Sequence, residues 1–189
     1  MKRVLVACEC SQVVTSAFRT AGADAWSCDL EPSYGMFPQY HIQGDVRLLL
    51  DGSISWDLVI AHPPCTYLSR VSAPWLKKDA GRWDKMAQAR EFFYFFVSLG
   101  VPTCIENPVP LRAAGLPAPS QKVNPCDFGH PYSKKTYLWL YDLPPLLTMR
   151  GYYLKPKSWH DHCSGGSKKR SRFWEGLAEA MAAQWLSLV

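Results

Sequence analysis

Short apolar runs alternate with amphipathic stretches along this chain. The runs that predict buried strands, because they are apolar and rich in branched or aromatic residues, are 3–8, 25–29, 56–61, 103–106 and 135–141. The stretches with helical spacing of apolar residues are 11–22, 85–99 and 173–188. Strands that alternate with helices predict an α/β fold with a mostly parallel sheet and helices on both faces.

The segments 107–134 and 142–171 are rich in Pro, Gly, Ser and Lys, and we interpret them as functional loops within one domain that covers residues 1–189. A hydrophobic content of 48% with 20% charged residues argues against disorder. The chain has no apolar run of the roughly 20 residues that a membrane span needs, and its start does not resemble a secretory signal.

The charge and the cysteines suggest a compartment and a partner. Seven cysteines without an export signal are expected to be reduced in the cytoplasm. The net charge of +5 is compatible with a polyanionic partner.

Reactive side chains follow the predicted strands, where a doubly wound sheet binds its ligands. The thiol of Cys65 follows the stiff segment His62-Pro63-Pro64, and a partly ionised cysteine is an effective nucleophile. Arg70 or a helix start could lower its pKa. The alternative interpretation of Cys65 is a small buried apolar side chain.

Glu106 ends the next predicted strand, where desolvation can let a carboxyl group hold or donate a proton near neutral pH. The alternative is a glutamate that faces solvent. A thiolate that attacks carbon 6 of a pyrimidine needs a proton or hydrogen bond at ring nitrogen 3, so Cys65 and Glu106 together supply both roles.

Two aspartates stand where an adenosine cofactor would be held. Asp29 ends the second predicted strand, at the place where an acid accepts hydrogen bonds from ribose hydroxyls. Asp45, after Gly44, could accept from the adenine amino group. Both could equally be ordinary turn or capping residues.

Five segments of the sequence, taken together, resemble those of a known family. Val-Leu-Val-Ala-Cys-Glu-Cys-Ser, Ser-Cys-Asp-Leu-Glu-Pro, Gly-Asp-Val, Asp-Leu-Val-Ile-Ala-His-Pro-Pro-Cys and Cys-Ile-Glu-Asn-Pro occur in this order. The order resembles the cytosine-carbon-5 DNA methyltransferase family, and in particular its small phage- and prophage-type members. The resemblance implies a Rossmann-like methyltransferase fold, S-adenosylmethionine as methyl donor, a covalent adduct at carbon 6 and a base flipped out of the duplex. It also implies DNA as partner and the cytoplasm of a bacterial or phage-infected cell as the place of action.

Carried over by position, the resemblance makes Cys65 the nucleophile and Pro64 the proline before it. Glu106 is then the residue that engages nitrogen 3, and Asn107 is its neighbour. It implies a cofactor site made of Ala7, Glu9, Cys10, Ser11, Asp29, Leu30, Asp45, Val46, His62 and Pro63.

The chain departs from the family in three places. Its first loop, residues 7–12, contains no glycine, and Ser133-Lys134-Lys135-Thr136 stands where family members carry a basic motif with arginine. The residues between the last predicted strand and the last predicted helix, 142–172, are too few for a separate target-recognition domain. We therefore expect low sequence specificity, a protein partner that supplies it, or a substrate other than duplex DNA.

Basic and aromatic residues suggest contacts to nucleic acid. The candidates for phosphate contact are Arg70, Lys134, Lys135, Lys168, Lys169, Arg170 and Arg172. Tyr67, Trp75 and Trp83 could stack on a displaced base or belong to the core. The alternative for the basic run is a solvated turn.

The spacing of Cys126, His130, His160, His162 and Cys163 is not a standard zinc pattern, and we expect no metal. The aromatic run 92–96 is expected to be helix core.

Three functions remain open: an active DNA methyltransferase, a related enzyme that modifies a free cytosine nucleotide, and an inactive relative that binds nucleic acid. Methylation of an exocyclic amino group is disfavoured, because those enzymes carry an aromatic residue where Cys65 stands.

Overall fold

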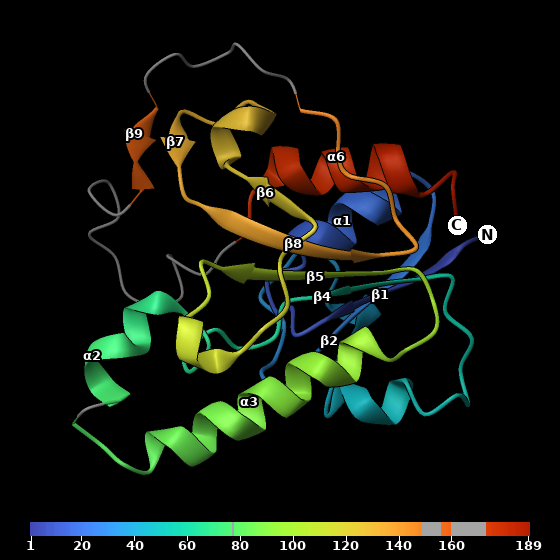
Figure 1. The fold of residues 1–189 in the computed structure, drawn as a ribbon. Coiled ribbons are helices and arrows are strands. Elements are labelled where there is room, and N and C mark those ends of the chain that lie inside the picture. The colour runs from blue at the N-terminus through green and yellow to red at the C-terminus, as the bar shows by residue number, and fades with distance from the viewer. Residues whose placement is uncertain (77, 149–155, 160–172) are drawn as a thin grey trace.

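The computed structural model describes residues 1–76, 78–148, 156–159 and 173–189, and its centre is a seven-stranded sheet (Figure 1). The strand order is β3-β2-β1-β4-β5-β8-β6. The strands are β1 (Arg3–Ala7), β2 (Asp24–Asp29), β3 (His41–Gln43), β4 (Leu58–Ala61), β5 (Thr103–Pro108), β6 (Gln121–Val123) and β8 (Thr136–Tyr141). A separate two-stranded sheet pairs β7 (Tyr132–Ser133) with β9 (Lys157–Ser158).

The strands β1 to β5 run parallel, whereas β8 is antiparallel to both of its neighbours, β5 and β6. The order 3-2-1-4-5 is that of a Rossmann-like sheet, in which the chain reverses its direction of winding between β1 and β4. The predicted α/β fold with a mostly parallel sheet is therefore confirmed.

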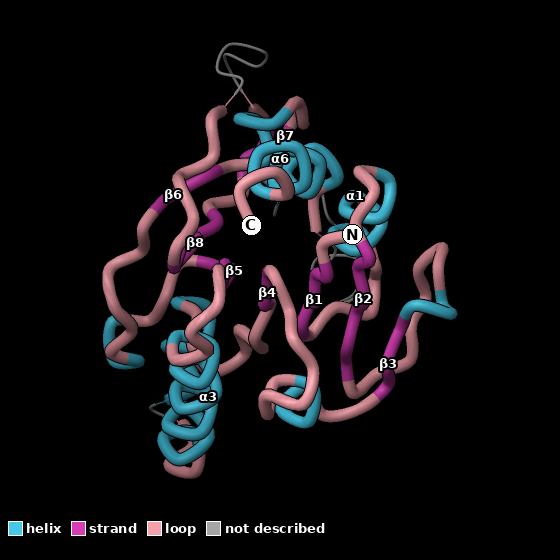
Figure 2. The backbone as a smooth tube through the Cα atoms, turned by 90° about the vertical axis from the view of Figure 1, so that its right-hand side faces the viewer, coloured by secondary structure: helices cyan, strands magenta, loops and turns pink. Residues whose placement is uncertain are grey.

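Helices cover both faces of the sheet, as Figure 2 shows from the side. The helices α1 (Val13–Thr20) and α6 (Glu175–Trp185) pack on one face, and α3 (Arg82–Val97) packs on the other, with the short α2 (Ala73–Leu76) before it. A hydrophobic core lies on each face of the sheet. Alternate residues of each strand belong to one core or the other, because successive side chains of a strand point to opposite faces. Val4 packs with α1 and α6, for example, and Leu5 packs with the α3 side.

The sequence missed the short strands β3 and β6. Each has three residues, too few for a periodic pattern, and each is defined by its pairing with β2 or β8. The fifth strand also continues beyond its predicted end at Glu106. Its pairing with β8 includes Asn107 and Pro108, so Glu106 lies within the strand.

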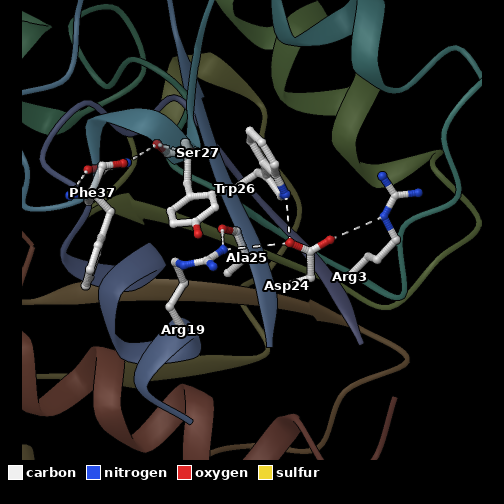
Figure 3. Close-up of polar contacts among 9 residues, drawn as sticks. Arg3, Arg19, Asp24, Ala25, Trp26, Ser27 and Phe37 are labelled. Atoms are coloured by element: carbon white, nitrogen blue, oxygen red, sulfur yellow. Dashed lines mark hydrogen bonds and ion pairs between the residues drawn. The ribbon is translucent and has the colours of Figure 1, made fainter. Parts of the chain in front are cut away.

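Charged side chains at the amino end of the sheet serve the fold. Asp24, the first residue of β2, accepts a hydrogen bond from the indole of Trp26 and lies within 3.8 Å of the guanidinium groups of Arg3 and Arg19 (Figure 3). Arg19 also donates a hydrogen bond to the carbonyl of Ala25, and its guanidinium stacks on the ring of Tyr40. This network lies at the opposite end of β2 from Asp29 and attaches α1 to the strand.

The start of α6 depends on a histidine from a distant loop. The backbone N–H of Gly176 donates to Nε2 of His130 at 3.0 Å. A Cβ atom at Gly176 would lie 2.1 Å from the carbonyl oxygen of Phe128, so this approach requires glycine. Burial lowers the pKa of His130 against the opposing charges of Glu175 and Glu179, which fits an imidazole that must stay neutral to accept.

Among the described residues, no helix has the length and apolar character to cross a membrane.

Candidate active site

A cavity of about 360 Å³ lies at the carboxyl edge, by which we mean the edge where β1, β2, β4 and β5 end. Its lining comes from the end of β2, from the segments after β1, β2, β3 and β4, and from α3: Cys8, Cys28, Asp29, Leu30, Gly44, Asp45, Val46, Arg47, Pro64 and Phe92. The position beside the β1–β4 reversal is where open α/β sheets bind their ligands. Four of the ten predicted cofactor residues meet here: Asp29, Leu30, Asp45 and Val46.

The two aspartates of this cavity already hold local hydrogen bonds. Asp29 accepts from the backbone N–H of Glu31 at 3.0 Å through Oδ1. Asp45 accepts from the backbone N–H of Arg47 at 3.0 Å and also binds its guanidinium through both carboxylate oxygens. The hydrogen bonds with Arg47 lower the pKa of Asp45, which therefore stays charged at the mouth of the cavity.

Sequence reasoning missed Arg47 and Phe92. The position of Arg47 two residues after Asp45 could have indicated it, because an Asx turn at such a spacing brings the two side chains together. Phe92 opens the aromatic run predicted to be helix core, but it is only half-buried and faces the cavity. The lining of the cavity thus includes an aromatic ring as well as two acids.

Burial affects the two cysteines of the cavity, Cys8 and Cys28. Burial, with further contributions from Asp29 and Asp45, raises the pKa of Cys28 to about 11 and that of Cys8 even further. Both thiols therefore stay protonated at neutral pH, and their effect on a ligand is steric.

The glycine-free first loop bends by placing ordinary residues in the left-handed region. Cys8 has φ 60° and Gln12 has φ 55°, values at which glycine is usual. The amide of Gln12 is fully buried and bonds Ser27 and both backbone groups of Phe37. A Cβ atom at Gly35 would lie 2.5 Å from that of Gln12, so the glycine that permits close packing stands in the neighbouring loop.

Glu9 does not line the cavity, contrary to its predicted cofactor role. Its carboxylate is 4% exposed and accepts hydrogen bonds from the N–H of Val14 at 2.7 Å, the N–H of Thr15 at 3.1 Å and the hydroxyl of Thr15 at 2.7 Å. These are free donors of the first turn of α1, and a negative charge there is stabilised by the helix dipole. Glu9 therefore caps α1.

Five further predicted cofactor residues lie outside this cavity: Ala7, Cys10, Ser11, His62 and Pro63. Ala7 and Pro63 are buried, and Ser11 lines a second cavity of about 510 Å³ between α1, α6 and residues 34–36. For these residues the structure supports a role in shaping the first loop and the Pro-Pro turn.

The Pro-Pro turn places Cys65 beside the end of β5. The amide of Asn107 is buried and donates to the carbonyl of Pro63 at 2.9 Å, which joins the turn after β4 to the adjacent strand. The carbonyl of Cys65 accepts from the N–H groups of Leu68 and Ser69, so the residue opens a tight turn. Cys65 is half-buried, and Pro64 next to it lines the cavity.

Burial and then the charge of Glu106 raise the pKa of Cys65, and Lys134 opposes them. The prediction that Arg70 lowers this pKa is wrong, because Arg70 lies exposed on the turn that follows and the opposing cation is Lys134. Burial and the charge of Glu106 thus both favour the protonated form of the thiol.

His62 faces Glu106 and not the cavity. Its Nδ1 lies 3.2 Å from Oε2 of Glu106, and its ring packs on that of Phe173 with centroids 4.8 Å apart. The predicted contact between its side chain and a cofactor is therefore not supported.

The segment after Cys65 combines aromatic and basic side chains. The guanidinium of Arg82 lies 4.8 Å from the centre of the Tyr67 ring, and Trp75 and Trp83 are 53% and 50% exposed.

Of the predicted phosphate contacts, Arg70 and Lys135 are exposed and Lys134 is half-buried. The other four, Lys168, Lys169, Arg170 and Arg172, lie outside the described residues.

No group of three or more candidate metal ligands occurs among the described residues, and His160, His162 and Cys163 lie outside them. The six cysteines of the described part are free thiols.

Comparisons with known proteins give matches in structure and none in sequence. No family model matches the chain, and no curated protein matches it. Among similar solved structures is that of a candidate DNA modification methyltransferase encoded within a prophage of E. coli. The two chains share 18% identity with a TM-score of 0.49, over 74% of this chain and 46% of that one. The chain thus spans less than half of that protein's length.

Proposed function

We propose that this protein transfers a methyl group from S-adenosylmethionine to ring carbon 5 of cytosine, in DNA, with Cys65 as covalent nucleophile and Glu106 as its acid–base partner. One observation carries the proposal: Cys65 stands next to Pro64, which lines a cavity with two acids at the β1–β4 reversal, and Glu106 lies toward the same edge on the adjacent strand β5. This is the same combination of side chains on which the resemblance to cytosine methyltransferases depends.

The cavity suits the adenosine part of the cofactor. Asp29 offers a carboxylate at the end of β2, the position that accepts ribose hydroxyls in Rossmann-like folds. Leu30, Val46 and Phe92 give the apolar walls that an adenine ring needs, and Asp45 can accept from its amino group. Bound there, the cofactor would supply an electrophilic methyl group.

The two reacting side chains act in sequence on the cytosine. With Glu106 protonated, the thiol of Cys65 loses its proton to water and its sulfur bonds to carbon 6, while Glu106 delivers its proton to nitrogen 3, so that carbon 5 becomes nucleophilic. After methyl transfer, carbon 5 loses its proton to water, the electrons of that bond form the double bond between carbons 5 and 6, the sulfur leaves as thiolate, and the proton on nitrogen 3 returns to Glu106. Because the charge of Glu106 raises the pKa of Cys65, the thiol is more acidic while Glu106 is protonated.

A polynucleotide substrate is supported by the segment after Cys65. Tyr67 with Arg82, and the exposed rings of Trp75 and Trp83, offer stacking surfaces and positive charge in the segment that follows the thiol. Sequence selection would come from a protein partner or be weak.

The deciding experiment measures methyl transfer from labelled S-adenosylmethionine to DNA, RNA and dCMP in parallel. We expect transfer to DNA by the unaltered protein, loss in Cys65→Ser, and retention in Cys126→Ser, a half-buried cysteine of another loop that serves as matched control. DNA that contains 5-fluorocytosine should form a stable adduct only when Cys65 is present.

Each outcome has one meaning. Transfer to dCMP alone would identify a nucleotide-modifying enzyme, and binding to DNA without any transfer would identify an inactive relative. Transfer that survives in Cys65→Ser would exclude the covalent mechanism. Calorimetry with S-adenosylhomocysteine tests the cofactor separately: Asp29→Ala should weaken binding about tenfold or more, the loss of roughly one hydrogen bond to a charged group.

A further inference from the structure

The histidine and glutamate at the ends of β4 and β5 form a pair that the mechanism above leaves unexplained. His62 is the first residue after β4, and its N–H donates to the carbonyl of Ala7 at 2.9 Å, so its backbone is fixed against β1. Its side chain is 12% exposed and that of Glu106 is 16% exposed. The contact of 3.2 Å between Nδ1 and Oε2 is therefore largely shielded from water.

The surroundings of His62 indicate which nitrogen carries the proton. Nε2 is buried and has no hydrogen-bond partner among the described residues. A buried N–H without an acceptor is costly, whereas Nδ1–H has the carboxylate of Glu106 as acceptor. A neutral ring with its proton on Nδ1 satisfies both conditions. This arrangement occupies Oε2 of Glu106 and leaves Oε1 for another partner.

We propose that His62 is a positioning residue for Glu106: its Nδ1–H holds one carboxylate oxygen so that the other is aimed at nitrogen 3 of the cytosine. This inference rests on the proposed function and replaces the cofactor contact predicted for His62. When Glu106 has delivered its proton, the same hydrogen bond stabilises the resulting carboxylate, because a bond to a charged acceptor is about twice as strong as a neutral one.

Phe173 supports this role by fixing the ring from the other side. Its ring contacts that of His62 at a centroid distance of 4.8 Å, next to the start of α6. A side chain locked by packing on one face and by a hydrogen bond on the other is the kind of support that an acid–base residue needs.

The test compares three substitutions of His62 in the full chain. His62→Phe keeps a ring against Phe173 and removes the donor. His62→Asn keeps an N–H donor near the position of Nδ1, and His62→Gln moves the donor to the position of Nε2. We expect kcat for DNA methylation to fall about 100-fold in the Phe and Gln variants, at the lower end of the effect of general acid catalysis, and to recover at least about tenfold in the Asn variant.

Two further readouts separate positioning from packing and from cofactor binding. In a Glu106→Gln background, His62→Phe should lower kcat by less than about threefold more, because both changes remove the same function. Affinity for S-adenosylhomocysteine should stay within about twofold in every His62 variant that thermal unfolding shows to be folded.

An unchanged kcat in His62→Phe, or full additivity with Glu106→Gln, would overturn the inference. A loss of cofactor affinity with kcat unaffected would restore the cofactor contact and also overturn it. These outcomes are distinct from failure of the proposed function, in which the unaltered protein itself transfers no methyl group to any substrate and the inference falls with it.

Discussion

Replacing Glu9 distinguishes a helix cap from a cofactor residue. Its carboxylate satisfies two backbone N–H groups and one hydroxyl at the start of α1, at distances between 2.7 and 3.1 Å. Val14 and Thr15, which supply these donors, are fully buried. In Glu9→Ala the three donors lose their acceptor in a place where water has little access.

The size of the effect follows from these contacts. A buried donor without a partner costs about 1–3 kcal/mol, which gives an upper range of roughly 3–9 kcal/mol for three donors. Water that enters the space left by the side chain would satisfy some of them, so we expect a loss of about 4 kcal/mol. For a domain of this size, roughly 2–4 °C are lost per kcal/mol, and Tm should fall by about 8–16 °C. Glu9→Gln keeps one acceptor oxygen without the charge and should lose about half as much.

The assay is thermal and urea unfolding without cofactor, followed by calorimetry with S-adenosylhomocysteine. Glu91→Ala, at an exposed position of α3, is the matched control and should change stability by less than about 0.5 kcal/mol. A Tm for Glu9→Ala within about 2 °C of the unaltered protein would refute the capping role. Lower cofactor affinity in Glu9→Gln at unchanged stability would show that Glu9 binds the cofactor after all.

Three further predictions concern ionisation and packing. Glu106→Gln removes a charge that raises the pKa of Cys65, so alkylation of Cys65 at neutral pH, followed by peptide mass spectrometry, should become severalfold faster; a slower reaction contradicts the pairing. Because the pKa of His130 is lowered from 6.5 in the folded state, the unfolded chain binds more protons below that pH. Stability should therefore decrease as the pH falls through about 6.5, and this decrease should be smaller in His130→Gln, measured by urea unfolding at several pH values. Gly176→Ala should destabilise the protein by about 3 kcal/mol in thermal unfolding, since its Cβ atom would lie 2.1 Å from the carbonyl oxygen of Phe128; helix propensity alone predicts the opposite sign.

The main elements of the fold could be predicted because their signals are local. Apolar runs marked β1, β2, β4, β5 and β8 within a few residues, and the helical period marked α1, α3 and α6. The strands β3 and β6 were not predicted, since a segment of three residues shows no periodic pattern and only pairing with a neighbouring strand defines it.

Sequence reasoning located an edge of the sheet but not what each side chain contacts there. Asp29 and Asp45 share a cavity, because strand ends of a parallel sheet meet at one edge. Glu9 also follows a strand at this edge, but its carboxylate binds the start of α1, where unpaired backbone donors attract its charge. Arg47 and Phe92 line the cavity although no motif includes them.

The sequence by itself determined which groups stand at the strand ends, among them the thiol of Cys65 and the carboxyl group of Glu106, because residue type and the end of an apolar run are local facts. Only the tertiary structure decided what each group touches: Glu9 caps a helix, His62 bonds Glu106, and Lys134 instead of Arg70 acts on Cys65. These pairings depend on which distant strands the chain crossings place side by side. Hydrogen bonds and charge interactions fall off over a few ångströms, so their partners are chosen by that placement and cannot be derived from sequence spacing.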